Sequence, residues 1–542
     1  MSRAAPNVLF IHPKFSNTSF WNYVETCELV GAKYPAPPLG LITVAAMLPE
    51  SWRVRLVDRN VAELTDEEID AADLVMFGGM ITQQMDLLAT AARAKARGKI
   101  TVVGGPDVSS SPEIYADLDF RIIGEAEGAI DAFIDAWETG ASEGEFRAPL
   151  HSIDVTKTPN PRFDLLNFSN YVQLNVQFSR GCPFLCEFCD IIELFGRKPR
   201  TKDTAQILAE LDRIYALGYR GHVDFVDDNL IGNKKAVKLF LPHLVDWQKR
   251  HGYPFEFSTE ASLNLADDDE FLGMMRDAGF FACFVGIESP DPDVLVAMQK
   301  KQNTKRDIAS CIHKINTYGI FIVAGFIVGF DNESELASEG MIELIEEASI
   351  PVSMVGLLVA LPNTQLQRRL EKEQRLHDLF GVIEDEQDGD QCVSGLNFET
   401  LRPRADILEQ YLKVVKRIYE PANYFARVRK TVELLDCSGV VGDLRRSTIR
   451  HDVKQFIQFL WNITVKRPDM RGHVWRLLAH VLRKNPRAIK HALYTAGLYA
   501  HLGPFAQYVQ REMASQIAAV KADPNAPRHR TFRGKLEGVA AE

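Results

Sequence analysis

Cysteine is scarce in this chain: only eight of its 542 residues are cysteines, and five of those are scattered. The other three, Cys182, Cys186 and Cys189, stand close together. Such numbers provide no disulfide framework, which excludes a disulfide-stapled secreted domain and favours a reducing compartment. We therefore expect the protein in the cytoplasm.

Long apolar runs are also missing. The longest, from Gly319 to Phe330, has 12 residues, whereas a membrane-spanning helix needs about 18 or more. The first residues, MSRAAPNVLFIHPKF, lack the apolar stretch of about 7–15 residues that marks a signal peptide. The sequence thus predicts neither a signal peptide nor a transmembrane segment.

An overall excess of positive charge is absent as well. The formal net charge is -11, so we expect no nucleic-acid partner. The charge is unevenly divided, however. Residues 401–542 carry 26 Lys and Arg against 12 Asp and Glu, whereas the first 400 residues carry 36 against 61. An acidic body with a basic tail indicates a separate docking surface on the tail.

The sequence predicts an α/β fold that begins with a Rossmann-like domain over residues 1–140. Short apolar runs alternate with helix-period segments, which is typical of a parallel sheet covered on both faces. The predicted strands are Val8–Ile11, Val54–Val57, Leu74–Phe77, Ile100–Val103 and Phe120–Ile123. Gly104, Gly105 and Gly124 follow strands. Ligands bind at that edge of open α/β sheets, although plain turns would explain the glycines too.

Residues 171–365 repeat the strand–helix rhythm six times, which predicts a partial (β/α)6 barrel, two units short of a closed one. A polar linker over residues 141–170 precedes it, and an acidic, solvated connection over 366–400 follows it. The predicted barrel strands are Val172–Phe178, His222–Val226, Phe255–Ser258, Ala282–Ile287, Ile320–Val328 and Ser353–Ala360.

The basic tail, residues 401–520, is predicted to be an α-helical domain, and residues 521–542 are predicted to be disordered. Its last helices are expected at Ile489–Ala500 and Pro504–Val520. Near Trp475, apolar residues alternate with Arg476, Arg483 and Lys484. Three interpretations remain open: a helix packed on the barrel with a solvated basic side, a basic amphipathic surface that rests on anionic lipid, or a nucleic-acid docking surface.

The clustered cysteines have the spacing Cys-x3-Cys-x2-Cys directly after a predicted strand, and the next cysteine, Cys283, lies 94 residues downstream. A structural zinc site needs four ligands, and a ferredoxin-type cluster needs four cysteines. Three thiolates on a four-iron cluster would leave one iron open to a substrate or cofactor. The alternatives are a zinc site completed from a distant segment, or three unrelated buried thiols.

This motif, with Phe188 before the third cysteine, resembles that of the radical S-adenosylmethionine (SAM) superfamily. The resemblance implies that the three cysteines ligate a [4Fe-4S] cluster whose open iron binds SAM, and that Phe188 contacts the adenine. Later strand ends match the family in order, which implies cofactor-binding roles for Asp227, Glu260, Glu288, Ser289, Gly325 and Gly329. Singly, a strand-end carboxylate is about as often a helix cap or a salt-bridge partner.

The first domain resembles the cobalamin-binding domain of B12-dependent radical enzymes, which implies cobalamin contacts at Gly104, Gly105 and Gly124. Nucleotide binding and a structural remnant are the alternatives. Classical cobalamin domains with a protein imidazole on cobalt carry Asp-x-His-x-x-Gly. Here Phe10 and Phe15 occupy the Asp and Gly positions around His12, so we expect His12 not to bind cobalt.

The whole layout resembles a bacterial subgroup that includes the hopanoid C-2 methylases. This resemblance implies cobalamin-dependent methylation of an unactivated carbon in an apolar, lipid-like small molecule. It also implies an electron donor such as flavodoxin or ferredoxin, and it is compatible with peripheral membrane contact through the basic helices. The alternatives are a radical cyclisation, rearrangement or C–C coupling without methyl transfer, and a non-catalytic cobalamin or redox sensor.

Overall fold

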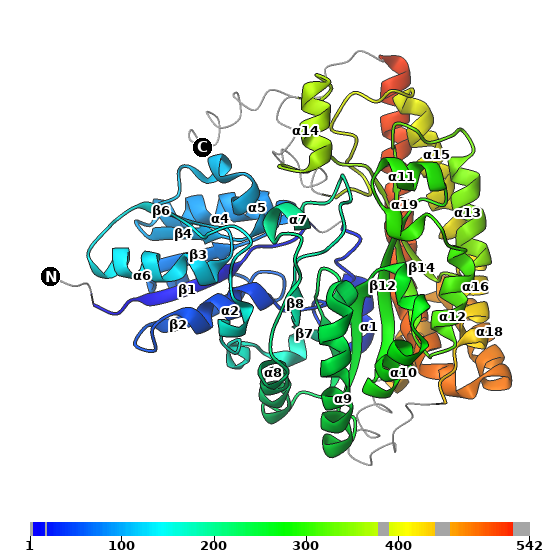
Figure 1. Ribbon diagram of the computed structural model, residues 1–542, viewed down its shortest axis with the longest axis horizontal. Helices are drawn as coiled ribbons and strands as arrows, with labels where there is room; N and C mark the ends of the chain where they lie inside the picture. The colour runs from blue at the N-terminus through cyan, green and yellow to red at the C-terminus, as the bar shows by residue number, and fades with distance from the viewer. Residues whose placement is uncertain (1–3, 17–18, 378–389, 439–455, 524–542) are drawn as a thin grey trace.

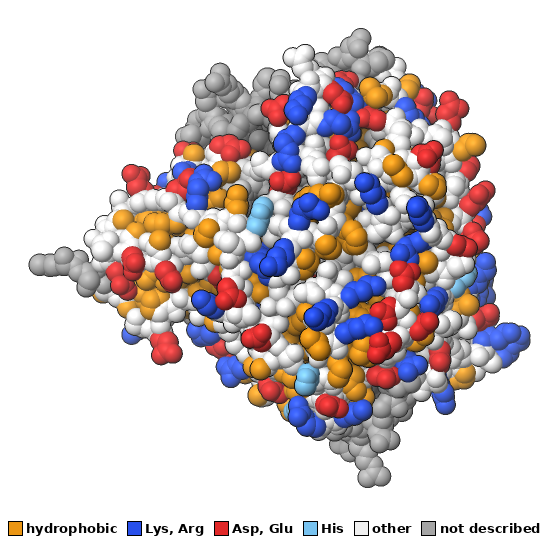
Figure 2. Space-filling model, in the orientation of Figure 1, with side chains coloured by type: hydrophobic (Ala, Val, Ile, Leu, Met, Phe, Trp, Pro, Cys, Tyr) orange, Lys and Arg blue, Asp and Glu red, His pale blue; other side chains and the backbone are white. Residues whose placement is uncertain are grey.

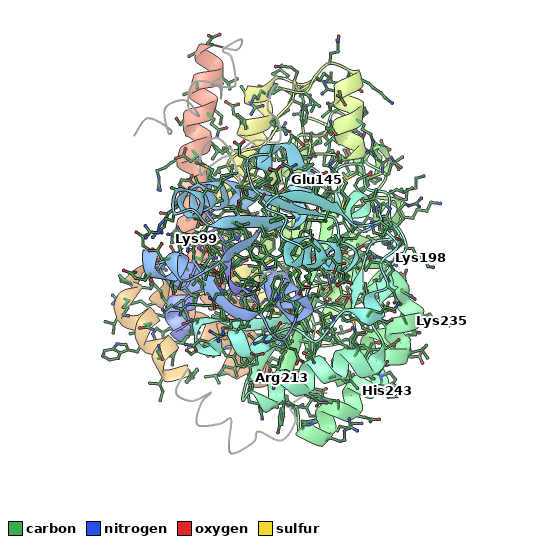
Figure 3. All side chains as sticks on the ribbon, turned by 90° about the vertical axis from the view of Figure 1, so that its left-hand side faces the viewer. Lys99, Glu145, Lys198, Arg213, Lys235 and His243 are labelled. Carbon is green, nitrogen blue, oxygen red and sulfur yellow. The ribbon has the colours of Figure 1, made fainter. Side chains whose placement is uncertain are left out.

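The computed structural model describes residues 4–16, 19–377, 390–438 and 456–523. Along the chain, an N-terminal α/β domain is followed by a second sheet covered with helices and then by a group of long helices (Figure 1). Seen from the side of the N-terminal domain, Lys99 and Glu145 of that domain lie in front of the central sheet. Arg213 on α8 and His243 on α9 lie below them (Figure 3). The N-terminal domain therefore covers one side of the central sheet.

The N-terminal sheet is fully parallel, with the strand order β2-β1-β3-β4-β5-β6. Its strands are β1 Asn7–His12, β2 Arg53–Asp58, β3 Leu74–Gly78, β4 Ile100–Gly104, β5 Phe120–Ile123 and β6 Gly144–Arg147. Both faces are covered, which explains why the inner strands read as continuous apolar runs. One face packs on α2 and α6, and the other on α3, α4 and α5. The helices are α1 Val24–Val30, α2 Leu39–Met47, α3 Asp66–Asp70, α4 Gln84–Ala96, α5 Pro106–Ser110 and α6 Ile130–Glu138.

Strand β6 was not predicted, because it lies inside the segment that we expected to be an irregular linker. Its sequence, Gly-Glu-Phe-Arg, alternates half-buried and exposed residues at the sheet edge. An edge strand with one solvated face has no apolar run to reveal it.

The second sheet contains the six predicted barrel strands, all parallel, in the order β14-β13-β12-β11-β10-β7. They are β7 Gln173–Val176, β10 Gly221–Phe225, β11 Phe255–Ala261, β12 Phe280–Glu288, β13 Phe321–Val328 and β14 Val352–Leu357. The helices are α7 Ile191–Leu194, α8 Thr204–Ala216, α9 Lys234–His251, α10 Asp269–Ala278, α11 Pro292–Ala297, α12 Ile308–Asn316, α13 Ala337–Glu347 and α14 Gln365–Lys372. The partial (β/α)6 barrel is therefore confirmed.

The tail is helical, as predicted, but its last part is one helix rather than two. The long helices are α15 Arg404–Ile418, α16 Pro421–Leu434, α18 Pro468–Lys484 and α19 Ile489–Ala522. Pro504 lies inside α19 and cannot donate the hydrogen bond that Ala500 would accept four residues earlier. The Arg467 guanidinium donates to that Ala500 carbonyl instead, at 2.7 Å. This long-range contact lets the helix continue through the proline.

Part of the segment expected to be a solvated acidic connection is in fact buried. Asp390 accepts hydrogen bonds from the backbone N–H groups of Phe20 and Cys392, and Cys392, Leu396 and Phe398 join the core. The carboxylates of residues 384–388 lie outside the described residues. The barrel and the C-terminal helices share a single apolar core. In the part of the chain described, no helix is long and apolar enough to cross a membrane.

Candidate active site

The three clustered cysteines lie on a loop that two short strands hold together. β8 Ser179–Arg180 pairs antiparallel with β9 Arg200–Thr201 at either end of the loop. Gly181 begins the loop with a φ of +92°, and a Cβ there would stand 2.8 Å from the Gly196 carbonyl oxygen. Only glycine fits such a close backbone approach in the left-handed region.

Two carboxylates after β10 hold the start of this loop. Asp227 is buried and accepts hydrogen bonds from the N–H groups of Phe178 and Ser179 and from the Ser179 hydroxyl. Asp228, which the sequence analysis did not single out, accepts from the Gly181 N–H at 2.7 Å. Because both oxygens of Asp227 are engaged, the contacts favour a positioning role over the predicted contact with the cofactor.

The three thiols stand on this one loop and form no disulfide. Burial raises the pKa of each thiol. Repulsion from a neighbouring thiolate adds to the effect at Cys182 and Cys189, and the charge of Glu288 adds to it at Cys186. A bound metal reverses this preference, because a coordinating thiol is deprotonated outright. Among the described residues, no group of three or more His, Cys, Asp or Glu side chains is placed so that it could hold one metal ion.

A buried ion pair lies beside the loop. Glu288, at the end of β12, pairs with Lys300, whose ammonium group lies 6.0 Å from the centre of the Phe188 ring. Burial alone would lower the pKa of Lys300, but the negative charges of Glu288 and Cys186 outweigh it and raise the pKa. Of the predicted residues, Glu288 therefore lies beside the cysteine loop that carries Phe188. Ser289 is buried next to them and accepts from the Asp291 N–H.

Gly325 in β13 and Gly329 directly after it serve packing in this structure. A Cβ on Gly325 would stand 2.9 Å from the Phe284 ring on the neighbouring strand, and one on Gly329 would stand 2.5 Å from the Leu396 side chain. Gly329 therefore accommodates the segment that leads into the C-terminal helices. Local sequence pattern could not predict this contact, because Leu396 is 67 residues away.

A line of polar side chains follows the inner face of the barrel sheet. The His222 ring lies 2.6 Å from the Ser258 hydroxyl, which donates to Asp224. Two residues further along β11, Glu260 projects into the cavity. Within the part that the structure describes, its carboxyl group has no hydrogen-bond or ion-pair partner. Burial raises the pKa of Glu260 to about 8, and repulsion from neighbouring carboxylates adds to it. A protonated Glu260 can donate as well as accept a hydrogen bond.

The predicted glycines of the N-terminal domain meet at the carboxyl edge of its sheet. Gly105 has a φ of +105°, and a Cβ there would stand 3.1 Å from the backbone N and O of Gly79. Gly104 ends β4 directly before Gly105, and Gly124 follows the neighbouring strand β5. Open backbone at this edge is where open α/β sheets bind their ligands.

His12 ends β1 at the same edge, but both of its ring nitrogens already have partners. Nδ1 lies 3.1 Å from an Asp58 oxygen, and Nε2 lies 3.0 Å from the Gln83 side-chain nitrogen. Asp58 also accepts from the Tyr171 hydroxyl at 2.9 Å. A histidine held on both sides in this way fits the expectation that it is not a cobalt ligand.

Arg180 connects the cysteine loop to the N-terminal domain. Its guanidinium lies 3.1 Å from Glu125 and 2.7 Å from Glu127, directly after Gly124. Arg200 of β9 also pairs with Glu125, at 2.8 Å. This pairing could not be foreseen from the sequence, since 53 residues separate Arg180 from Glu127.

One cavity of about 1550 Å³ joins these parts. Typical small-molecule pockets have about 300–1,000 Å³, so this one can hold more than one group. Its walls come from three regions: the glycine edge of the N-terminal sheet, the polar line of the barrel that includes His222 and Glu260, and Phe459, Leu493 and Tyr494 of the C-terminal helices. Arg180 and Asp190, at the two ends of the cysteine loop, also line it.

Comparison with known protein families assigns each of the three regions. Residues 29–134 match the B12 binding domain and residues 176–345 match the radical SAM superfamily. Residues 364–515 match a domain of unknown function, DUF4070.

Among curated proteins, the chain is 42% identical to an uncharacterised methyltransferase of Synechocystis sp., over 94% of both chains. It is 38% identical to the hopanoid C-2 methylase of Rhodopseudomonas palustris, over 76% of this chain and 77% of that protein.

Solved structures show the same fold. The cobalamin-dependent SAM radical enzyme OxsB aligns with a TM-score of 0.59 and 14% identity, over 95% of this chain and 81% of that one. The radical SAM methyltransferase TsrM of Kitasatospora setae aligns with a TM-score of 0.54 and 14% identity, over 69% of this chain and 75% of that one.

The fold and the two matched domains define an enzyme class, the radical SAM enzymes with a B12-binding domain. Within that class, the chain belongs to the methyltransferase family that includes the hopanoid C-2 methylase. The two domains imply a [4Fe-4S] cluster, SAM and cobalamin as its cofactors.

Proposed function

We propose that this enzyme methylates an unactivated carbon of an apolar, hopanoid-like small molecule. The observation that carries the proposal is the single cavity, which is bounded at once by the cobalamin-type glycine edge, the cysteine loop region and the C-terminal helices. A methyl carrier and a radical source must both reach the same carbon, so their sites must open into one space.

The residues present fit the implied groups. Cys182, Cys186 and Cys189 would hold the cluster, because they are three free thiols gathered on one braced loop. Gly104, Gly105 and Gly124 would face cobalamin, because their backbone lies open to the cavity. When bound, these groups supply a carbon-centred radical and a transferable methyl group.

The chain itself supplies position and shielding. Glu187, within the cysteine loop, donates its N–H to the Met298 carbonyl and pairs through its carboxylate with Arg369 of α14. Asp227 and Asp228 hold the start of the loop. Phe284, Phe321 and Tyr494 give the cavity an apolar wall, which would admit a hydrocarbon skeleton and keep water out. Glu260 and the His222–Ser258–Asp224 line face into the same space and would bind polar groups of SAM or substrate.

The cluster assignment is tested with Cys186→Ala. Anaerobically reconstituted protein should lose bound iron and 5'-deoxyadenosine formation in this variant. Cys311→Ala, on α12 and away from the cavity, is the control and should keep both. Deoxyadenosine formation that survives in Cys186→Ala would contradict the assignment.

The substrate is tested by comparing lipid extracts from cells with and without this chain by mass spectrometry. A product heavier by one methyl group in the lipid fraction supports the proposal. Deoxyadenosine formation without methyl incorporation would instead indicate a cyclisation, rearrangement or coupling. A methylated product confined to tRNA, peptide or tetrapyrrole would refute the lipid-like substrate.

A further inference from the structure

The helical segment of residues 456–466 has two unlike faces. Residues 456–461 form an α-helix that continues as a π-helix over Asn462–Lys466. Phe456 and Phe459 line the cavity. On the opposite side, Ile457, Trp461 and Val465 are spaced four residues apart and are 60%, 65% and 55% exposed. A stripe of exposed large apolar residues on one helix marks an interaction surface.

The neighbouring helix α18 extends this apolar surface. Trp475 and Leu482 are 49% and 58% exposed, and they lie on one side of the helix because they are separated by about two turns. The other apolar residues of α18 face inward and pack in the core: Val474, Leu477, Leu478 and Val481. The structure thereby separates the residues that support the fold from those that are left at the surface.

Basic residues without carboxylate partners surround these apolar side chains. In the portion of the chain described, none of Lys466, Arg471, Arg476, Arg483 and Lys484 forms an ion pair, and the only acidic residue of α18, Asp469, pairs with Arg467. On α15 and α19, in contrast, Lys413, Arg417 and Lys521 are each paired with a glutamate. Lys and Arg side chains project at the edge where α18 lies (Figure 2).

We propose that this face rests on an anionic lipid surface. It consists of the apolar residues Ile457, Trp461, Val465, Trp475 and Leu482 and the five unpaired basic residues around them. The exposed apolar residues would enter the headgroup layer, where indole rings are favoured. The unpaired cations complement lipid phosphate groups, each adding to the binding.

A second copy of this chain is the less favourable occupant. A symmetric contact would bring the same arginine side chains of both copies together, and like charges facing each other oppose association. The helix position also suits a lipid surface, because the segment that carries Trp461 on its outer side carries Phe459 on the cavity side. Delivery of an apolar substrate along this segment rests on the proposed function, whereas the membrane contact stands on the surface alone.

The test is flotation of the reconstituted full-length enzyme with vesicles. The enzyme should float with mixed phosphatidylglycerol and phosphatidylcholine vesicles at low ionic strength, and much less with phosphatidylcholine alone. Trp461→Glu should weaken the partition into anionic vesicles by more than about fivefold, since it removes an indole and adds a repelled charge. Replacing Arg471, Arg476 and Arg483 by glutamine should abolish the preference for anionic vesicles.

Leu239→Glu is the matched control, because Leu239 on α9 is 65% exposed but lies away from this face. It should float like the wild type. The proposal is overturned if the wild type does not bind anionic vesicles or if Leu239→Glu and Trp461→Glu weaken binding equally. A dimer that Trp461→Glu converts to a monomer would assign the face to self-association. Deoxyadenosine formation, measured without vesicles, should survive in Trp461→Glu, so failure of the proposed function is detected separately.

Discussion

Arg180 offers the sharpest test of how the cysteine loop is held against the N-terminal domain. Its side chain is 14% exposed, and those of its partners Glu125 and Glu127 are 3% and 10% exposed. In Arg180→Met, Glu125 keeps Arg200, but Glu127 keeps only a hydrogen bond from the Thr158 hydroxyl. An uncompensated carboxylate would then remain buried between the two domains.

Breaking a buried ion pair by removing one partner costs about 3–5 kcal/mol. We expect Arg180→Met to lower the free energy of unfolding by about that amount near neutral pH. Arg162→Met is the control. Its pair with Asp164 is 41% and 31% exposed, and such surface pairs contribute about 0–1 kcal/mol. Urea unfolding followed by circular dichroism measures both variants.

The pH dependence of this loss has a definite sign. Burial alone would raise the pKa of Glu127, but Arg180 outweighs burial and lowers it in the folded enzyme. The stabilisation by this pair is therefore present above the ordinary glutamate pKa of 4.5 and is lost as the pH falls. The gap between wild type and Arg180→Met should shrink in acid. A loss below about 1 kcal/mol at neutral pH, or a gap that does not change with pH, would refute this account of the domain contact.

Two further predictions concern the cavity walls. Gly105→Ala should cost about 1–3 kcal/mol, because its φ of +105° with ψ of -178° is a backbone region open essentially to glycine, plus a clash with Gly79. It should also lower cobalamin retention measured by absorbance. Gly98→Ala is the control, because Gly98 has a φ of +71° but a Cβ added there would have no atom within 4 Å. It should show the backbone cost alone, and equal losses of stability in the two variants would refute the close approach at Gly105. The folded pKa of Glu260 is about 8, so the wild-type protein has its full stability below the ordinary glutamate pKa of 4.5. This stability is lost as the pH rises towards 8, because the unfolded state releases a proton that the folded state still holds. Glu260→Gln should therefore gain stability relative to wild type between about pH 5 and 8, measured by urea unfolding at each pH. A difference that stays flat over this range would contradict the raised pKa of Glu260.

Local pattern alone was enough to predict the chemistry and most of the strands. The spacing of Cys182, Cys186 and Cys189 is a property of a few adjacent residues. The inner strands of both sheets are visible as apolar runs because both of their faces are covered. Such features need no knowledge of what lies elsewhere in the chain.

Features that depend on a distant partner could not be predicted from local pattern. β6 has one solvated face and no apolar run, and α19 continues through Pro504 only because Arg467 satisfies the Ala500 carbonyl. Similarly, Val474 and Trp475 look alike in sequence, but only packing decides which of them is buried.

The features of the site also fall into those that local sequence predicts and those that depend on distant residues. The sequence by itself determined that three cysteines stand close together after a strand, and this motif carries the resemblance that implies the kind of cofactor. Only the tertiary structure decided that Asp227 holds this loop, that Arg180 joins it to Glu125 and Glu127, and that Glu260 faces the shared cavity. The physical reason is that covalent spacing fixes which residues are neighbours along the chain. Burial, pKa and ion pairing arise from residues that folding brings together.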